Sequence, residues 1–112
     1  MNVYTLPEVK QYLNDLITIL YDNGYFIFKE SAKKYVDELL DDIITELPIK
    51  QKRSAPKFFK DRYGERLYYA VFPKSKRTQW YVFFCMYQKD GQLYYQVRHI
   101  ENNHTAAQYF DH

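Results

Sequence analysis

An unbroken apolar stripe between residues 28 and 47 is the feature that most constrains how this chain can fold. Polar and charged residues fill most positions between the apolar ones, and Pro48 ends the pattern because proline cannot continue a helix. The apolar positions are separated by four, three or one residues, the spacing of one helix face: Phe28, Ala32, Tyr35, Val36, Leu39, Leu40, Ile43, Ile44 and Leu47. A helix of this kind must bury its stripe against a second layer.

Another helix is predicted before the stripe, ending near Tyr21. Residues 5–8 have the pattern of a capping box, in which Thr5 caps the helix and Glu8 bonds back to the cap. The Asp-Asn-Gly sequence at residues 22–24 ends this helix, since asparagine and glycine tolerate the left-handed backbone. The short connection predicts an antiparallel pair of helices. Residues 1–4 are expected to form a short first strand.

Beyond Pro48 the helical spacing gives way to strands. Asp90-Gly91 predicts a tight hairpin between the last two strands, because the turn needs positive φ angles. The strand between residues 79 and 88 is apolar on both faces, which favours a central position in a sheet. Three strands are predicted, at residues 67–72, 79–88 and 92–101.

Two shorter segments complete the chain. Residues 49–57 are polar and basic and predict an exposed connector. Phe58 and Phe59 then either begin a short strand or attach the connector to the core. Residues 105–110 are expected to form a short C-terminal helix.

These elements predict a single α+β domain covering residues 1–112. The N-terminal helical hairpin is expected to pack on one face of a small, mainly antiparallel sheet of three to five strands. A hydrophobic content of 46% and an aromatic content of 20% are sufficient for one modest core. The other face of the sheet is expected to stay open.

Charge is distributed unevenly along the chain. Residues 50–77 hold ten basic residues against Asp61 and Glu65, a net charge of +8, whereas the first 48 residues hold four basic and nine acidic residues, a net charge of −5. A concentrated positive surface attracts polyanions, so nucleic acid or an acidic protein is the expected partner. The residues predicted to bind nucleic acid are Lys50, Lys52, Arg53, Lys57, Lys60, Arg62, Lys74, Lys76 and Arg77.

Several classes of protein are disfavoured by what the sequence lacks. One cysteine and three histidines are too few for a disulfide framework or a convincing zinc site, so no metal is expected. There is no glycine-rich phosphate loop, and no cofactor is expected. No apolar run approaches the ~20 residues that a membrane helix needs. The beginning of the chain lacks the pattern of a signal peptide, so we expect a cytoplasmic protein without a membrane partner.

Four segments together resemble the RelE/ParE toxin superfamily of type II toxin–antitoxin systems: SAKKYVDELLDDIITELP, GERLYYAVF, TQWYVFFCMY and QVRHIENNHTAAQYF. The resemblance implies a small cytoplasmic toxin that is neutralised by a cognate antitoxin protein. RelE-like members are ribonucleases that bind mRNA at the ribosome in a basic concavity on the open sheet face and cleave it without a metal. ParE-like members keep the fold, lack this chemistry and act on DNA gyrase.

The resemblance also implies where chemistry would lie. Family ribonucleases draw catalytic groups from basic residues on the central strands and from Arg, His or Tyr near the C-terminus, which here gives Arg66, Arg98, His99, His104 and Tyr109 as candidates. Of these, Arg66, Arg98, His104 and Tyr109 are predicted to be catalytic. Strand alternation places Arg98 on the face opposite Leu93, Tyr95 and Val97, where a guanidinium could bind phosphate. His104 has the chemistry for acid–base work, and Tyr109 for stacking on a base or donating a proton.

Each candidate also has a structural interpretation. Arg98 could pair with Glu101 or Asp111, His104 could cap the last helix, and Tyr109 could pack on the sheet. Strand alternation places His99 on the same face as Val97, so His99 is expected at the edge of the core. Asparagines and His104 stand where the ribonucleases have an arginine, so a gyrase-directed toxin and a catalytically silent interaction module stay open as alternatives.

Overall fold

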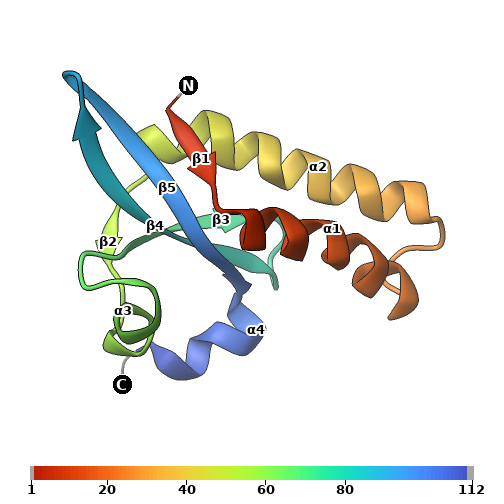
Figure 1. Ribbon diagram of the computed structural model, residues 1–112. Coiled ribbons are helices and arrows are strands. Elements are labelled where there is room, and N and C mark those ends of the chain that lie inside the picture. The colour runs from red at the N-terminus through yellow and green to blue at the C-terminus, as the bar shows by residue number, and fades with distance from the viewer. Residues whose placement is uncertain (1, 111–112) are drawn as a thin grey trace.

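The structure is a computed structural model that describes residues 2–110, and its architecture confirms the predicted α+β class. The sheet has five strands in the order β1-β5-β4-β3-β2; β1 pairs in parallel with β5, and the other pairs are antiparallel. The helices α1 and α2 pack on one face of this sheet (Figure 1). The elements are β1 (Val3–Thr5), α1 (Pro7–Asp22), α2 (Lys29–Glu46), the 3₁₀ turn η1 (Leu47–Ile49), β2 (Arg53–Ser54), α3 (Lys57–Tyr63), β3 (Tyr68–Pro73), β4 (Gln79–Lys89), β5 (Gln92–Asn102), α4 (Asn103–Ala106) and the 3₁₀ turn η2 (Ala107–Tyr109).

The main core lies between the helical hairpin and the sheet. Five residues of the predicted stripe are buried, Ala32, Val36, Leu39, Ile43 and Leu47, and Tyr35, Leu40 and Ile44 are half-buried. Phe28, the first residue of the predicted stripe, is instead 65% exposed, because it caps α2 in an extended conformation. Burial of these apolar side chains is the main force that holds the hairpin to the sheet. The sheet residues buried against the helices are Val3, Ala70, Phe72, Trp80, Val82, Phe84, Tyr95, Val97 and Ile100.

The predicted capping box at the start of α1 is wrong. Thr5 lies in β1 and pairs with Val97, so its backbone is extended and belongs to the sheet. Leu6 occupies the cap position without a side-chain hydrogen bond, and Pro7 begins the helix with its preset φ angle. As a result Glu8 is not used as a cap and stays available on the first turn of α1.

A second, smaller core covers part of the sheet face that was predicted to be open. Residues 57–63 form helix α3, and Phe59 on this helix is 1% exposed and stacks on Phe83 with ring centroids 4.2 Å apart. The chain after α4 contributes Phe110, whose ring lies against Tyr69 and Tyr81. Figure 1 shows α3 and α4 at one end of the sheet, away from the β4–β5 turn.

The segment predicted as an exposed connector is therefore partly structured. Residues 53–54 form β2 at the sheet edge, and Ala55 beside them is buried. Phe58 and Phe59 do not begin a strand, because Pro56 and Gly64 bound a short helix around them. The alternative prediction, attachment of this segment to the core, is confirmed at Phe59.

Two turns follow their predicted chemistry. Asp90 and Gly91 connect β4 to β5 with φ angles of 52° and 77°, as the tight hairpin requires. The C-terminal helix begins slightly earlier than predicted, and the Asn102 side chain caps it by accepting hydrogen bonds from the backbone N–H groups of His104 and Thr105. The interpretation of His104 as the cap is therefore wrong.

A β-bulge in β5 changes the orientation of the residues that follow it. Phe83 pairs with His99 and the next residue of β4 pairs with Val97, so Arg98 has no partner across the ladder. The extra residue resets the alternation, which lets Ile100 enter the main core and turns His99 to the opposite face beside Phe83. The prediction that His99 lies on the same face as Val97 is therefore wrong.

Candidate active site

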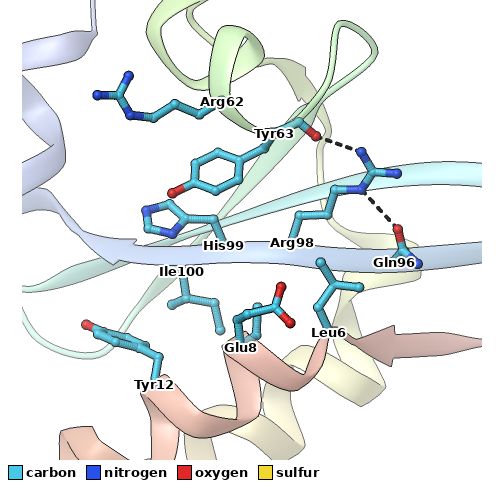
Figure 2. A pocket seen from close by; sticks show the side chains of 10 residues that line it. Leu6, Glu8, Tyr12, Arg62, Tyr63, Gln96, Arg98, His99 and Ile100 are labelled. Atoms are coloured by element: carbon cyan, nitrogen blue, oxygen red, sulfur yellow. Dashed lines mark hydrogen bonds between the residues drawn. The ribbon is translucent and has the colours of Figure 1, made fainter.

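A cleft of about 690 Å³ lies beside the second half of β5. Strand β1 is only three residues long, so it covers only part of the edge of β5. Beyond Thr5, the start of α1 lies along this edge instead of another strand. The end of α3 forms the opposite wall (Figure 2). The cleft is lined by Leu6, Glu8, Val9, Tyr12, Arg62, Tyr63, Gln96, Arg98, His99 and Ile100.

A stacked pair of rings lies at the centre of this cleft. The rings of Tyr63 and His99 are nearly parallel, with centroids 4.6 Å apart and an interplanar angle of 12°. His99 Nε2 donates to Glu101 Oε1 at 2.8 Å, and both of these side chains are about three-quarters covered. A carboxylate on one ring nitrogen orients an imidazole and stabilises its charged form. The second ring nitrogen, Nδ1, makes no hydrogen bond within residues 2–110.

Two arginines flank the stacked rings (Figure 2). Arg98 lies on the α3 side of the sheet, the face predicted for it, where Nη1 donates to the Tyr63 carbonyl oxygen at 2.6 Å and Nε donates to Gln96 Oε1 at 3.0 Å. Within residues 2–110, Nη2 of Arg98 makes no hydrogen bond. Arg62 is exposed, and its guanidinium lies 3.9 Å from the centroid of the Phe58 ring. Both arginines keep donors that can bind phosphate oxygens.

Glu101, one of the two predicted alternative partners of Arg98, does not pair with it. The Glu101 carboxylate is bound to His99, and Asp111 lies outside the described residues. Arg98 is held by a backbone carbonyl and an amide oxygen, which are neutral acceptors. Its positive charge is therefore not neutralised by these two contacts.

Gly64 provides the space for Arg98 at the end of α3. Its φ angle is 128°, and a Cβ added there would lie 2.8 Å from Arg98 Nη1. Gly64→Ala is expected to lower the free energy of unfolding by about 1–3 kcal/mol, because other residues rarely adopt this backbone conformation. Urea denaturation measures the loss. Gly24→Ala is the control. Gly24 also has a positive φ angle, of 79°, but a Cβ added there would have no atom of residues 2–110 within 4 Å. Equal losses in the two variants would contradict a specific constraint at Gly64.

Two tyrosines of the cleft hold their protons tightly. Burial raises the pKa of Tyr12 above the ordinary value of 10.0, and the negative charge of Glu101 raises it further. Burial also raises the pKa of Tyr63 above 10.0, again assisted by Glu101, while Arg62 acts in the opposite direction. Both phenols are therefore protonated at neutral pH and can donate hydrogen bonds.

The raised tyrosine pKa values predict a loss of stability in alkali. A group with a raised folded-state pKa binds its proton more tightly in the folded chain, so its contribution is present below the unfolded pKa and is lost as pH rises through the folded value. Stability should fall above about pH 10, and Tyr12→Phe should make this fall shallower. Urea unfolding at about pH 8 and about pH 11 measures the difference. Identical losses in both proteins would refute a role for Tyr12.

The other predicted catalytic residues lie outside this cleft. His104 is exposed on α4, with Nε2 3.4 Å from Thr78 Oγ1, and it lines a different cleft. Tyr109 stacks on Phe58 with ring centroids 3.6 Å apart, at the edge of the second core. Arg66 is exposed in the turn between α3 and β3. Of the four predicted residues, Arg98 is the one that lines the cleft with His99.

The cations predicted to bind nucleic acid are divided among three places. Several already have partners: Lys52 donates to two backbone carbonyl oxygens at 3.0 Å, Lys57 pairs with Asp61 at 2.7 Å, and Lys74 lies 3.9 Å from an aspartate of α2. Arg62 is the member of the set that lines the cleft. The three places are β2 with the residues before it (Lys50, Lys52 and Arg53), helix α3 (Lys57, Lys60 and Arg62) and the β3–β4 connection (Lys74, Lys76 and Arg77).

The sequence prediction considered His99 but assigned it to the edge of the core, and it did not pair His99 with Glu101, as the structure does. One signal in the sequence could have located them. The apolar residues Tyr95, Val97 and Ile100 are separated by two and then by three positions. A step of three in a strand with one buried face indicates an inserted residue, and it predicts that His99 turns away from the core.

Comparisons with protein-family models, curated proteins and solved structures find no match to this chain. Within residues 2–110 there is no group of three or more His, Cys, Asp or Glu side chains that could hold a metal ion. The same part of the chain has no helix of the length and apolar character needed to cross a membrane.

Proposed function

We propose that this protein is a toxin of the RelE/ParE kind that cleaves mRNA at the ribosome through the cleft beside β5. One observation carries the proposal: the stacked Tyr63–His99 pair, with Glu101 bound to the histidine and an arginine on either side. RNA cleavage by its own 2′-hydroxyl needs a base, cations that bind the phosphate, and an acid for the leaving oxygen. The cleft brings one candidate for each role together.

The proposed reaction begins at His99. Its free ring nitrogen removes the proton of the 2′-hydroxyl, while Glu101 holds the ring and stabilises the imidazolium that forms. The 2′-oxygen attacks phosphorus, and the bond from phosphorus to the 5′-oxygen breaks. The products are a 2′,3′-cyclic phosphate and a 5′-hydroxyl end. Tyr63, whose phenol is protonated at neutral pH, gives its proton to the leaving 5′-oxygen.

The two arginines are proposed to bind the phosphate that reacts. Arg98 is oriented by its hydrogen bonds to Tyr63 and Gln96, so its remaining donors are presented in a fixed direction. A preoriented guanidinium stabilises the negative charge that develops on the phosphate oxygens at little cost in side-chain freedom. Arg62 contributes a second positive charge from α3.

The toxin assignment itself is supported by the four segments that resemble RelE/ParE proteins and by a helical hairpin packed on a small sheet. It brings two partners into the proposal, a neutralising antitoxin and the ribosome with its mRNA. The free donors of Arg62 and Arg98 suit the phosphate backbone of that mRNA.

Controlled expression in a bacterium tests this function. The unchanged protein should stop growth, and mRNA from the arrested cells should be cut. Arrest with intact mRNA and with inhibited supercoiling by DNA gyrase would instead identify the ParE-like alternative. Normal growth at high expression would contradict both kinds of toxin and favour an interaction module.

A further inference from the structure

Three tyrosines from three different strands form a row on the sheet face that carries Arg98. Tyr94 of β5 lies in the middle, stacked against Tyr87 of β4 with centroids 5.4 Å apart and an interplanar angle of 15°. Tyr4 of β1 stacks on the other side of Tyr94, with a centroid distance of 5.8 Å and an angle of 27°. We call Tyr4, Tyr94 and Tyr87 the tyrosine row.

The outer ends of the tyrosine row are accessible. Tyr4 belongs to β1, which is the edge strand of the sheet, and it is 51% exposed. Tyr87 lies beyond Phe84, the last residue of β4 that pairs with β3, and it is 44% exposed. Within residues 2–110, no strand therefore continues the sheet beside either outer ring, and each ring keeps a large part of its surface available.

The row is continuous with the cleft through one residue. Tyr4 pairs with Gln96 across the β1–β5 ladder, and Tyr94 precedes Gln96 by two residues on the same face. Gln96 lines the cleft and accepts the hydrogen bond from Nε of Arg98. Tyr94 and Arg98 are four residues apart, roughly 13 Å along an extended strand. A nucleic acid strand with a phosphate at Arg98 would pass over the tyrosine row.

We infer that the tyrosine row is a stacking platform for the bases of single-stranded RNA next to the cleavage site. Aromatic rings bind bases of any identity, because every base has a flat π-face. Tyr4 and Tyr87 keep about half of their surface exposed, so a base can stack on them without displacing another part of the protein. The inference rests on the proposed function, which identifies the ligand as RNA. It goes beyond that function by naming the surface that holds the RNA beside the cleft.

Binding of a labelled single-stranded RNA of about eight nucleotides, followed by fluorescence anisotropy, tests the platform. The measurement uses the full chain carrying His99→Gln, so that the RNA stays intact. Tyr87→Ala and Tyr4→Ala, each added to this background, should weaken binding roughly tenfold. Tyr87→Phe keeps the ring and should bind normally. Tyr25→Ala is the matched control, because Tyr25 is 71% exposed on the loop between α1 and α2.

Two further readouts separate stacking from other effects. The slope of the logarithm of the binding constant against the logarithm of the salt concentration should be unchanged in the tyrosine variants. Arg98→Gln should reduce this slope by about the contribution of one phosphate contact. Duplex RNA of the same sequence, whose bases are already stacked, should bind equally to the tyrosine variants and their background. Circular dichroism confirms that each variant is folded.

The outcomes distinguish this inference from the proposed function. Normal single-strand binding by the folded Tyr4 and Tyr87 variants overturns the platform, even if the unchanged protein cleaves RNA. Tyrosine-dependent binding supports the platform, even if no cleavage is found and the proposed function fails. Equal weakening in Tyr25→Ala, or no RNA binding by the background protein, also overturns the platform and would leave a protein partner as the occupant of this face.

Discussion

The His99→Gln protein is expected to cleave RNA about 10²- to 10⁴-fold more slowly than the unchanged protein, which is the usual contribution of a general acid or base. Glutamine is close to histidine in size and can still form a hydrogen bond with Glu101, but it cannot take up a proton. The fold should therefore survive while the chemistry is lost. Single-turnover cleavage of ribosome-bound mRNA measures the rate, and urea denaturation verifies the fold.

The same substitution at His104 distinguishes the two histidines. His104 is the histidine that the family resemblance favours, but it lies on α4 and lines a different cleft. We expect His104→Gln to cleave within about twofold of the unchanged rate, a difference equivalent to less than 0.5 kcal/mol. A large loss of rate in His104→Gln together with a normal rate in His99→Gln would mean that the active site is the cleft lined by His104.

Phe59→Ala is expected to lower the free energy of unfolding by about 3–5 kcal/mol. Phe59 is 1% exposed, and its ring stacks on Phe83 and packs edge-on against Phe58 and Tyr109. Removal of the ring leaves a cavity between α3, the sheet and the C-terminal segment. Because α3 also carries Arg62 and Tyr63, the variant should lose cleavage as well as stability. Urea denaturation at neutral pH measures the change.

Phe28→Ala is the matched control for this experiment. Phe28 is also a phenylalanine, but it caps α2 and is 65% exposed, so its removal should change stability by less than about 0.5 kcal/mol. A similarly small effect in Phe59→Ala would mean that residues 57–63 are exposed, like the connector that the sequence predicted at residues 49–57, and that α3 does not form a wall of the cleft.

Most of the fold could be predicted because its signals are local. The helix stripe ending at Pro48 and the Asp90-Gly91 turn each depend on residues within one element. Helix α3 has seven residues, too few for a periodic pattern to stand out from the surrounding basic residues. Its signals were Pro56 before it, Gly64 after it, and Phe59 and Tyr63 four positions apart on one face.

The cleft was only partly predictable for a different reason. Alternation along β5 placed Arg98 on the correct face, because the alternation holds up to the bulge. His99 lies just beyond the bulge, where alternation from the start of the strand gives the wrong face. The sequence signals the bulge only through the step of three from Val97 to Ile100, because the bulge depends on how β5 packs on the helices, which lie far away in sequence. The stacking of Tyr63 on His99 likewise requires α3, which had not been predicted.

The chemical nature of the cut ends tests the central claim most directly. Translating ribosomes are treated with the purified protein, and the ends of the mRNA fragments are then identified. Attack by the 2′-hydroxyl, assisted by His99, predicts a 5′-hydroxyl on one fragment and a 2′,3′-cyclic phosphate on the other. Fragments with 5′-phosphate ends, or mRNA that stays intact, would contradict the proposed cleavage at this cleft.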